Sequence, residues 1–515
     1  MHADAKTTAG RLRGAVNGGV ASFKGVPYGA DTSGTHRFMA PKPPIPWAGV
    51  RDALAYVAQA PQSRTGFGRR PEIADFASPP DTTPESEDCL TLNLWTPGAG
   101  DGAKRPVMVW LHGGAFSFGS ANGARLDGTN LARRGDVVVV TVNHRLNILG
   151  HLDLAMLGGP EFAASGNAGT LDMIAALEWV RDNAETFGGD PGNVTIFGES
   201  GGGGKVSTLM AMPLARGLFH RAIVQSGAVI RLRERDRAAL LTDAVLHQLG
   251  LGRAQLGELQ RMPLARLMAA IEPATTALGP SHWPLFDRYP FGPVVDGKIV
   301  PRHPFEPDAP DQSADIPLLV GDTKDEASLF LAQNDKIWHG TLTESEMRDQ
   351  VAAIAGDHTD RVIELYRRLH PGKSPADRLI ATLTDCNFRL RSLTMAERRA
   401  QKSRAPTYMY SFAWETPAFG GRLKSPHAMD VPFTFDTVHL LSPTDRDAPA
   451  FTLAATMSAT WAAFARTGTP DLPSIPLWPP YALDRRATLI LDNDCRIEDD
   501  PGHETRALWQ EIAVL

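Results

Sequence analysis

The sequence has few cysteines, no strong excess of one charge and no long apolar run, and each shortage excludes a class of protein. The three cysteines, Cys89, Cys386 and Cys495, are too far apart to have the spacing of a metal site. The 52 lysines and arginines are balanced by 58 aspartates and glutamates, which gives no support for binding to nucleic acid or to an anionic membrane. No run approaches the roughly 18 apolar residues of a membrane span, and residues 1–10 lack the apolar core of a secretion signal. We therefore expect a soluble, cytoplasmic protein with reduced thiols.

The rest of the composition is that of an ordinary globular protein. Of the 515 residues, 43% are hydrophobic and 21% are charged, which suffices for a sizeable core without help from a metal or a disulfide. No internal repeat, low-complexity tract or break in composition marks a second domain. We expect a single domain over residues 1–515.

Strand-like runs alternate with helical patterns along the chain. Short apolar and β-branched runs predict strands at residues 20–23, 87–95, 107–111, 137–142, 194–197, 222–225, 316–320, 406–414 and 487–491. The alternation within 87–95 predicts a strand with one buried face, and 487–491 is expected to be the last strand. The clearest helix covers 169–187, and 231–289 is mostly helical in pattern, as expected for a cap or pocket wall. This alternation predicts an α/β fold with a mainly parallel sheet.

One short stretch has the pattern of a nucleophile elbow, in which a serine stands on a sharp turn from strand to helix. It is the G-x-S-x-G match Gly198-Glu199-Ser200-Gly201-Gly202. The expected strand precedes it, and an apolar stretch that can form the following helix comes after it. The amino end of that helix would place free N–H groups and a positive dipole end beside Ser200. The plainer alternative is a glycine-rich turn with an exposed serine.

A reactive serine needs a base and an acid that orients the base. In the α/β-hydrolase fold these follow in the order serine, acid, histidine, each on a loop after a strand. Three acids follow the expected strand 316–320, and the pattern alone does not choose among Asp322, Asp325 and Glu326. Six histidines lie farther on: His339, His358, His370, His427, His439 and His503. Only His427 and His439 come soon after the strand 406–414, and His427 is the closer.

The chain resembles the type B carboxylesterases, the family of the bacterial para-nitrobenzyl esterases and, more remotely, of the cholinesterases. The matching runs cover nearly the whole length. They are residues 23–28, 37–38, 61–62, 87–90, 92–93, 112–116, 143–146, 166–169, 187–191, 198–202, 217–223 and 292–297. The resemblance implies that Glu326, in an Asp-Glu-Ala run where the family has Asp-Glu-Gly, is the catalytic acid. It likewise implies that His427, in a His-x-x-Asp run, is the base.

The resemblance also implies an oxyanion hole, formed by the backbone N–H groups of Gly114, Ala115 and Gly201. The residues agree with it, because a glycine pair directly after the strand 107–111 lets the backbone turn back over the strand's carboxyl end, where open α/β sheets bind their ligands. Glu199 is placed beside the serine by the same resemblance. Ser226 matches a family serine that supports the triad from behind.

The sequence departs from the family pattern at several positions. Ala60 stands where secreted animal members have a cysteine, so the cysteine of the Glu-Asp-Cys-Leu run is expected to be unpaired. Gly201 replaces the usual alanine after the serine and should constrain that oxyanion donor less. Ala327 replaces a glycine, so a backbone position with positive φ is either absent or strained there. His144 and Asn147 replace a tyrosine and a glycine on the expected substrate side of the sheet.

The expected reaction is acyl transfer from a carboxylic ester to water through an acyl-enzyme on Ser200. Aromatic side chains on loops are candidates for an apolar substrate pocket: Phe116, Phe118, Trp283, Phe286, Tyr289 and Phe291. With no basic cluster beside them, we expect neutral, hydrophobic esters of small to medium size. No metal or organic cofactor is implied.

Two alternatives come from other classes of protein. The first is an amide- or carbamate-cleaving hydrolase with the same triad, which differs only in pocket shape. The second is a non-catalytic binding protein of the same fold, since some relatives act in adhesion, although such proteins usually lose the serine or the histidine. The expected partner is a small-molecule ester, with no nucleic acid and no membrane. The sequence leaves open whether the chain is a monomer or a weak homodimer.

Overall fold

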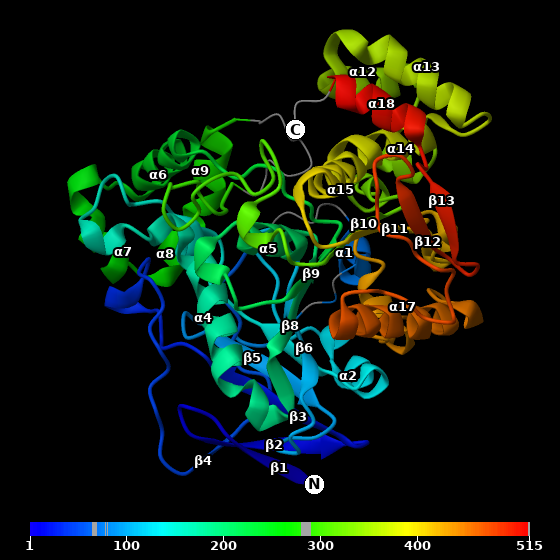
Figure 1. Ribbon diagram of the computed structural model, residues 1–515. Helices are drawn as coiled ribbons and strands as arrows, with labels where there is room; N and C mark the ends of the chain where they lie inside the picture. The colour runs from blue at the N-terminus through cyan, green and yellow to red at the C-terminus, as the bar shows by residue number, and fades with distance from the viewer. Residues whose placement is uncertain (64–69, 78, 80, 280–289, 513–515) are drawn as a thin grey trace.

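The described strands form one continuous sheet. The computed structural model describes residues 1–63, 70–77, 79, 81–279 and 290–512. Within them the sheet has thirteen strands in the order β1-β2-β3-β5-β7-β6-β8-β9-β10-β11-β12-β13, with β4 paired to β2 (Figure 1). The strands are β1 (His2–Lys6), β2 (Arg11–Asn17), β3 (Val20–Pro27), β4 (Val50–Asp52), β5 (Thr91–Thr96), β6 (Arg105–Leu111), β7 (Val138–Val142), β8 (Gly189–Glu199), β9 (Arg221–Gln225), β10 (Leu318–Thr323), β11 (Thr407–Phe412), β12 (Ala487–Leu491) and β13 (Arg496–Asp499).

The central strands are parallel, and the edge strands are antiparallel apart from β4, which pairs in parallel with β2. All neighbours from β7 through β6, β8, β9, β10 and β11 to β12 pair in parallel. The strands β1 to β3 and β5 add an antiparallel edge, and β13 adds another. The predicted α/β fold with a mainly parallel sheet is confirmed.

Helices cover both faces of the sheet, because alternate side chains of each strand point to opposite sides. On β6, Val107, Val109 and Leu111 belong to one hydrophobic cluster, and Met108 and Trp110 belong to another. The first face is covered by α4 (Ala168–Asn183), α5 (Gly201–Met210) and α15 (Leu390–Lys402). The second is covered by α2 (Thr129–Gly135), α16 (Val431–Thr434) and α17 (Ala448–Thr467).

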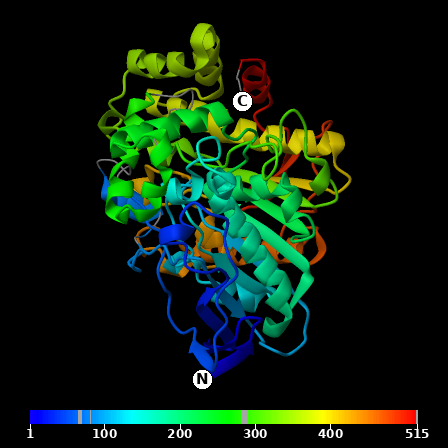
Figure 2. The same ribbon diagram turned by 90° about the vertical axis from the view of Figure 1, so that its left-hand side faces the viewer.

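Two groups of helices are inserted in the chain between consecutive strands of the sheet. Between β9 and β10 lie α6 (Arg235–Leu249), α7 (Leu256–Arg261), α8 (Leu264–Ala269) and α9 (Ile271–Ala277), as the helical pattern of this region predicted. Between β10 and β11 lie α10 (Ala327–Leu331), α11 (Asp335–Trp338), α12 (Glu344–Ala355), α13 (Thr359–Leu369) and α14 (Pro375–Thr384), followed by α15. Figure 2 shows both insertions at the end of the molecule remote from the N-terminus. The last helix, α18 (His503–Ile512), packs on the second insertion beside α12 and α13.

The structure corrects several of the expected boundaries. All six residues of β5 are buried, so this strand has no exposed face; its polar Asn93 is satisfied by hydrogen bonds that include the Gly25 N–H at 2.9 Å. The strand β8 begins at Gly189, five residues before the expected start. The strand β10 runs on to Thr323, which places Asp322 in the strand and not in the loop after it. A further edge strand, β13, follows the strand that was expected to be last.

A buried ion pair joins the loop after β7 to α4. The guanidinium of Arg145 donates to both carboxylate oxygens of Asp172, at 2.6 and 2.8 Å, and the Arg145 backbone N–H donates to the same carboxylate at 3.0 Å. Both side chains are almost completely buried. Arg145 also donates to the Met39 carbonyl at 2.8 Å, so one side chain ties the amino-terminal segment to the centre of the sheet.

We predict that Asp172→Ala destabilises the fold by about 3–5 kcal/mol, because it leaves the Arg145 charge buried without a partner. The midpoint of urea denaturation, followed by circular dichroism, is the measurement. The matched control is Asp315→Ala, which removes the same type of side chain from an exposed pair with Arg404 and should leave the midpoint unchanged. Equal midpoints for the two variants would contradict the prediction.

Candidate active site

Ser200 lies on a sharp turn between β8 and α5. Its backbone has φ 56° and ψ −122°, a conformation that residues other than glycine seldom adopt. The helix α5 begins at the next residue. The turn is crowded: a Cβ atom on Gly198 would lie 2.5 Å from the Leu111 carbonyl oxygen at the end of β6, and one on Gly202 would overlap the same oxygen. The two glycines of the motif are therefore required by the close approach of β6.

The predicted acid and base lie in direct contact. Glu326 follows β10, His427 follows β11, and the Nδ1–H of His427 donates to Glu326 Oε2 at 2.5 Å. The other oxygen of Glu326 accepts the Thr323 N–H at 2.8 Å, and both side chains are buried. The Nε2 atom of His427 lies 3.2 Å from Glu199 Oε1, and no hydrogen bond joins it to the Ser200 hydroxyl, although the structure describes both residues.

The other candidates for acid and base lie elsewhere. Asp322 pairs with the guanidinium of Arg389 at 3.3 Å. Asp325 accepts the Ser425 N–H at 3.4 Å, and His439 is exposed on a short turn after α16. Among these, Glu326 is the acid that the structure places against His427.

The loop after β6 rests on the elbow. Gly114 and Ala115 have positive φ angles of 87° and 53°. A Cβ atom on Gly113 would lie 3.7 Å from the Cβ of Ser200, and one on Gly201 would overlap the backbone N and O of Ala115. The structure thus brings together the backbones of the three predicted oxyanion donors. The glycine at 201, expected to loosen its donor, instead permits close contact with the loop.

Buried carboxylates set the charge of the predicted base. Burial alone would lower the pKa of His427, but the carboxylates of Glu199 and Glu326 outweigh it and raise that pKa to about 9. Burial raises the pKa of Glu199 to about 8, against the opposing effect of His427. The imidazolium form of His427 is therefore electrostatically stabilised.

A second layer of polar groups lies behind these residues. Asp430 accepts hydrogen bonds from Gln225 Nε2 and from the Tyr410 hydroxyl, both at 2.9 Å, and burial raises its pKa to about 6. Ser226 has a positive φ of 50°, and its N–H donates to the Gly321 carbonyl at 2.8 Å. Its hydroxyl is buried and has no hydrogen-bond partner among the described residues. The supporting role expected of Ser226 stays a prediction.

The aromatic residues expected to line a pocket are placed in different surroundings. Phe116 is buried, and its ring packs edge to face against the His151 ring, with the ring centroids 5.3 Å apart. The N–H of Phe118 donates to the Gly114 carbonyl at 3.1 Å. Phe291 lies in the hydrophobic cluster of the first insertion. Trp283, Phe286 and Tyr289 lie outside the described residues.

Two other phenylalanines contact the predicted base and were missed in the sequence. The ring of Phe330 lies 5.0 Å from the His427 ring, and that of Phe388 lies 5.1 Å from it. Phe330 stands one helical turn after Glu326 on α10, a spacing that could have revealed it. Phe388 lies in a π-helical turn (Asp385–Arg389) between α14 and α15, which no sequence pattern indicated. Phe330 also borders a cavity of about 690 Å³ on the second insertion.

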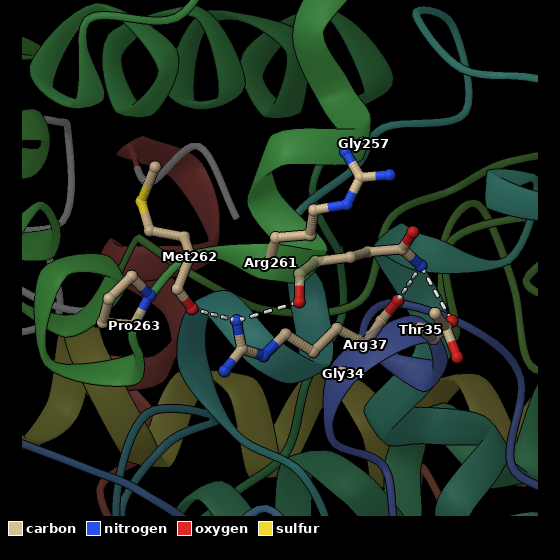
Figure 3. A pocket seen from close by; sticks show the side chains of 8 residues that line it. Gly34, Thr35, Arg37, Gly257, Arg261, Met262 and Pro263 are labelled. Atoms are coloured by element: carbon tan, nitrogen blue, oxygen red, sulfur yellow. Dashed lines mark hydrogen bonds between the residues drawn. The ribbon is translucent and has the colours of Figure 1, made fainter.

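Another cavity, of about 540 Å³, lies between the amino-terminal segment and α7 (Figure 3). Arg37 lines this cavity. The Arg37 guanidinium donates to the Glu87 carboxylate at 2.6 Å and to the Leu259 and Met262 carbonyls, so its hydrogen bonds are already made within the protein. None of the predicted catalytic residues lines this cavity. Arg37 therefore holds α7 on the amino-terminal segment.

In the described part of the chain, no three His, Cys, Asp or Glu side chains are grouped so as to hold a metal ion. None of the described helices is both long enough and apolar enough to cross a membrane.

Comparison with known proteins identifies the family. The sequence profile of the Carboxylesterase family matches residues 2–509. The chain belongs to the carboxylesterase family. It is 36% identical to a para-nitrobenzyl esterase of Bacillus subtilis (strain 168), over 98% of each chain, and 34% identical to a phenmedipham hydrolase of Pseudarthrobacter oxydans, over 95% of each. A solved Geobacillus stearothermophilus carboxylesterase superposes with a TM-score of 0.85 at 37% identity, covering 98% of this chain and 100% of its own.

Membership settles the class of protein. The chain is a carboxylesterase, a serine ester hydrolase with the α/β-hydrolase fold. The relatives above are named as an esterase, a hydrolase and a carboxylesterase, which counts against the alternative of a non-catalytic binding protein.

The departures from the family pattern have local structural consequences in this carboxylesterase. Asn147 adopts a positive φ of 46°, which asparagine tolerates, and its Nδ2 donates to the Pro61 and Ser117 carbonyls at 2.8 and 3.2 Å. His144 is buried and stacks on His112 with ring centroids 4.9 Å apart. Ala327 is the first residue of α10, so a helical backbone replaces the positive φ that a glycine would provide.

We predict that Glu199→Gln moves the acid limb of the kcat/KM profile of this carboxylesterase to lower pH. The Glu199 carboxylate raises the pKa of His427 by stabilising the imidazolium. Without that charge, neutral His427 is available at lower pH. The test is kcat/KM for a neutral p-nitrophenyl ester from pH 5 to 10, roughly the range in which these groups titrate. Glu511→Gln, at an exposed pair with Arg361, is the control that should leave the profile in place; an upward shift in Glu199→Gln would contradict the prediction.

We also predict that Gly201→Ala lowers kcat by about tenfold or more, because the new Cβ would overlap the Ala115 backbone and displace a predicted oxyanion donor. Gly257→Ala, where a Cβ would meet no atom within 4 Å, is the matched control on α7. Steady-state kinetics of the two variants and the wild type supply the measurement. Full activity of Gly201→Ala would show that the loop has room for the methyl group.

Proposed function

We propose that this carboxylesterase hydrolyses neutral, hydrophobic carboxylic esters through an acyl-enzyme on Ser200, with His427 as base and Glu326 as the acid that orients it. The observation that carries the assignment is the 2.5 Å hydrogen bond between His427 Nδ1 and Glu326, beside a serine on a strained elbow. This bond fixes the imidazole tautomer that leaves Nε2 free to accept the serine proton.

The proposed reaction has two halves. In the first, Ser200 attacks the ester carbonyl, His427 takes the serine proton and then gives it to the departing alcohol. In the second, His427 takes a proton from water as the water attacks the acyl-enzyme, and His427 then returns that proton to the Ser200 oxygen as the acid leaves. The N–H groups of Gly114, Ala115 and Gly201 would hold the oxyanion of each tetrahedral intermediate, each donor lowering the barrier by roughly 3 kcal/mol.

The preference for hydrophobic substrates rests on the surroundings of the base. Phe330 and Phe388 present two aromatic rings to His427, and rings at this distance from the reacting atoms favour apolar acyl or alcohol groups. The para-nitrobenzyl esterase among the relatives points to esters of aromatic alcohols as a second series to test.

A carbamate or amide is the second candidate substrate class. The observation in its favour is the 34% identity to a protein named phenmedipham hydrolase, so phenmedipham itself is the probe. We further propose the cytoplasm as the site of action and a monomer or weak homodimer as the active form. The three cysteines support the first of these, because none forms a disulfide in the structure.

We predict that the wild type hydrolyses p-nitrophenyl esters of short and medium acyl chains, and that Ser200→Ala lowers kcat by about 10⁴-fold or more, because the nucleophile is lost. Release of p-nitrophenol across a series from acetate to laurate is the measurement, and the chain-length optimum sizes the acyl pocket.

The control for this series is Ser442→Ala, which removes an exposed hydroxyl and should be fully active. Turnover of phenmedipham but of none of the esters would favour the carbamate candidate. Equal turnover by the wild type and Ser200→Ala would overturn the proposed function.

A further inference from the structure

A completely buried lysine lies beneath the predicted oxyanion hole. Lys205 is the fifth residue of α5, and its exposed fraction is 0%. Its ammonium donates to the His112 carbonyl oxygen at 2.7 Å, at the base of the loop that carries Gly114 and Ala115. The ring of Phe116, on the same loop, lies 5.5 Å from the ammonium.

The position is unfavourable for a lysine. If this residue only filled space, an apolar side chain would do so at a lower cost in free energy. A buried ammonium loses its hydration, and the positive end of α5 repels it. Burial accordingly lowers the pKa of Lys205 to about 7, and the carboxylate of Glu199 opposes that change. Glu199 is thus the counter-charge for Lys205 as well as for His427.

The histidines around Lys205 are arranged as neutral acceptors. His112, His144 and His151 are buried, and each donates its Nδ1–H to a backbone carbonyl, of Gly113, Arg145 and Gly166 respectively. Their Nε2 atoms have no partner among the described residues. Burial first, and the Lys205 ammonium after it, keep the pKa of His112 and His144 below the usual value. Lys205 is therefore the cation of this cluster.

We propose that Lys205 is a positioning residue, whose ammonium tethers the oxyanion-hole loop to the nucleophile helix through the His112 carbonyl and places a positive charge behind the hole. This inference rests on the proposed assignment of the oxyanion donors. It assigns Lys205 no contact with the substrate: the ammonium acts through the loop backbone and through its field. Both effects are larger in the transition state than in the ground state, because the negative charge on the substrate oxygen develops only there.

The experiment compares Lys205→Met, which keeps the length but loses the charge and the donor, with Lys205→Arg, which keeps both. For Lys205→Met we expect kcat to fall by about ten- to a hundredfold with KM within about threefold of the wild type. Binding of octyl trifluoromethyl ketone, which forms an oxyanion on the serine, should weaken by the same factor as kcat. Inhibition by n-octanol, which forms none, should be unchanged. Lys205→Arg should keep most of the wild-type kcat, provided that its melting temperature equals that of the wild type.

The control is Lys402→Met, at an exposed pair with Asp308, which should leave kcat unchanged. A Lys205→Met protein with kcat within about threefold of the wild type overturns the proposal, and so does parallel weakening of ketone and octanol binding. The proposed function fails separately, through equal turnover by the wild type and Ser200→Ala. Failure of this inference alone gives an inactive Ser200→Ala beside a fully active Lys205→Met.

Discussion

The close approach of β6 to the elbow is the constraint on which the site depends. The Leu111 carbonyl oxygen leaves no space for a Cβ on Gly198 or Gly202, and the next residues of the β6 loop lie directly over Ser200 and Glu199. A single strand end thus sets both the turn that carries Ser200 and the loop expected to hold the oxyanion. Because β6 and β8 are hydrogen-bonded neighbours in the sheet, their relative position is fixed by the backbone and not by flexible side chains.

Buried charge is the second constraint, and it is concentrated at the same place. Three carboxylates, of Glu199, Glu326 and Asp430, share a small buried volume with the cations that His427 and Lys205 can provide. Each needs a partner, since an isolated buried charge would cost several kcal/mol. Glu326 pairs with His427, Asp430 accepts two hydrogen bonds, and Glu199 interacts electrostatically with both His427 and Lys205. The protonation states of His427 and Lys205 are therefore coupled through Glu199.

Much of this arrangement follows from the sequence, and the parts that do not have physical reasons. The apolar runs and the serine motif suffice for the parallel sheet and the elbow, because both depend on local residue patterns. They do not separate Asp322 from Glu326, since that distinction depends on β10 continuing to Thr323. The edge strand β13 was not predicted, because Arg496, Glu498 and Asp499 are charged and leave Ile497 as its one apolar residue. The triad and oxyanion roles stay predictions that rest on the family resemblance, and the extent of the domain stays a prediction that rests on the even composition of the chain.

Lys205 shows most clearly where sequence patterns stop being informative. A lysine after four glycines in a helix looks like a solvent-exposed residue, and nothing local indicates that it is buried. The glycines supply the explanation. Each weakens α5 by about 1 kcal/mol relative to alanine, yet Gly201 admits the Ala115 backbone and Gly203 admits the Gly227 backbone, with a Cβ on Gly203 lying only 2.8 Å from the Gly227 Cα. A helix start stripped of side chains in this way packs closely on the loops around it, and the long side chain of Lys205 reaches back across that bare surface to the His112 carbonyl.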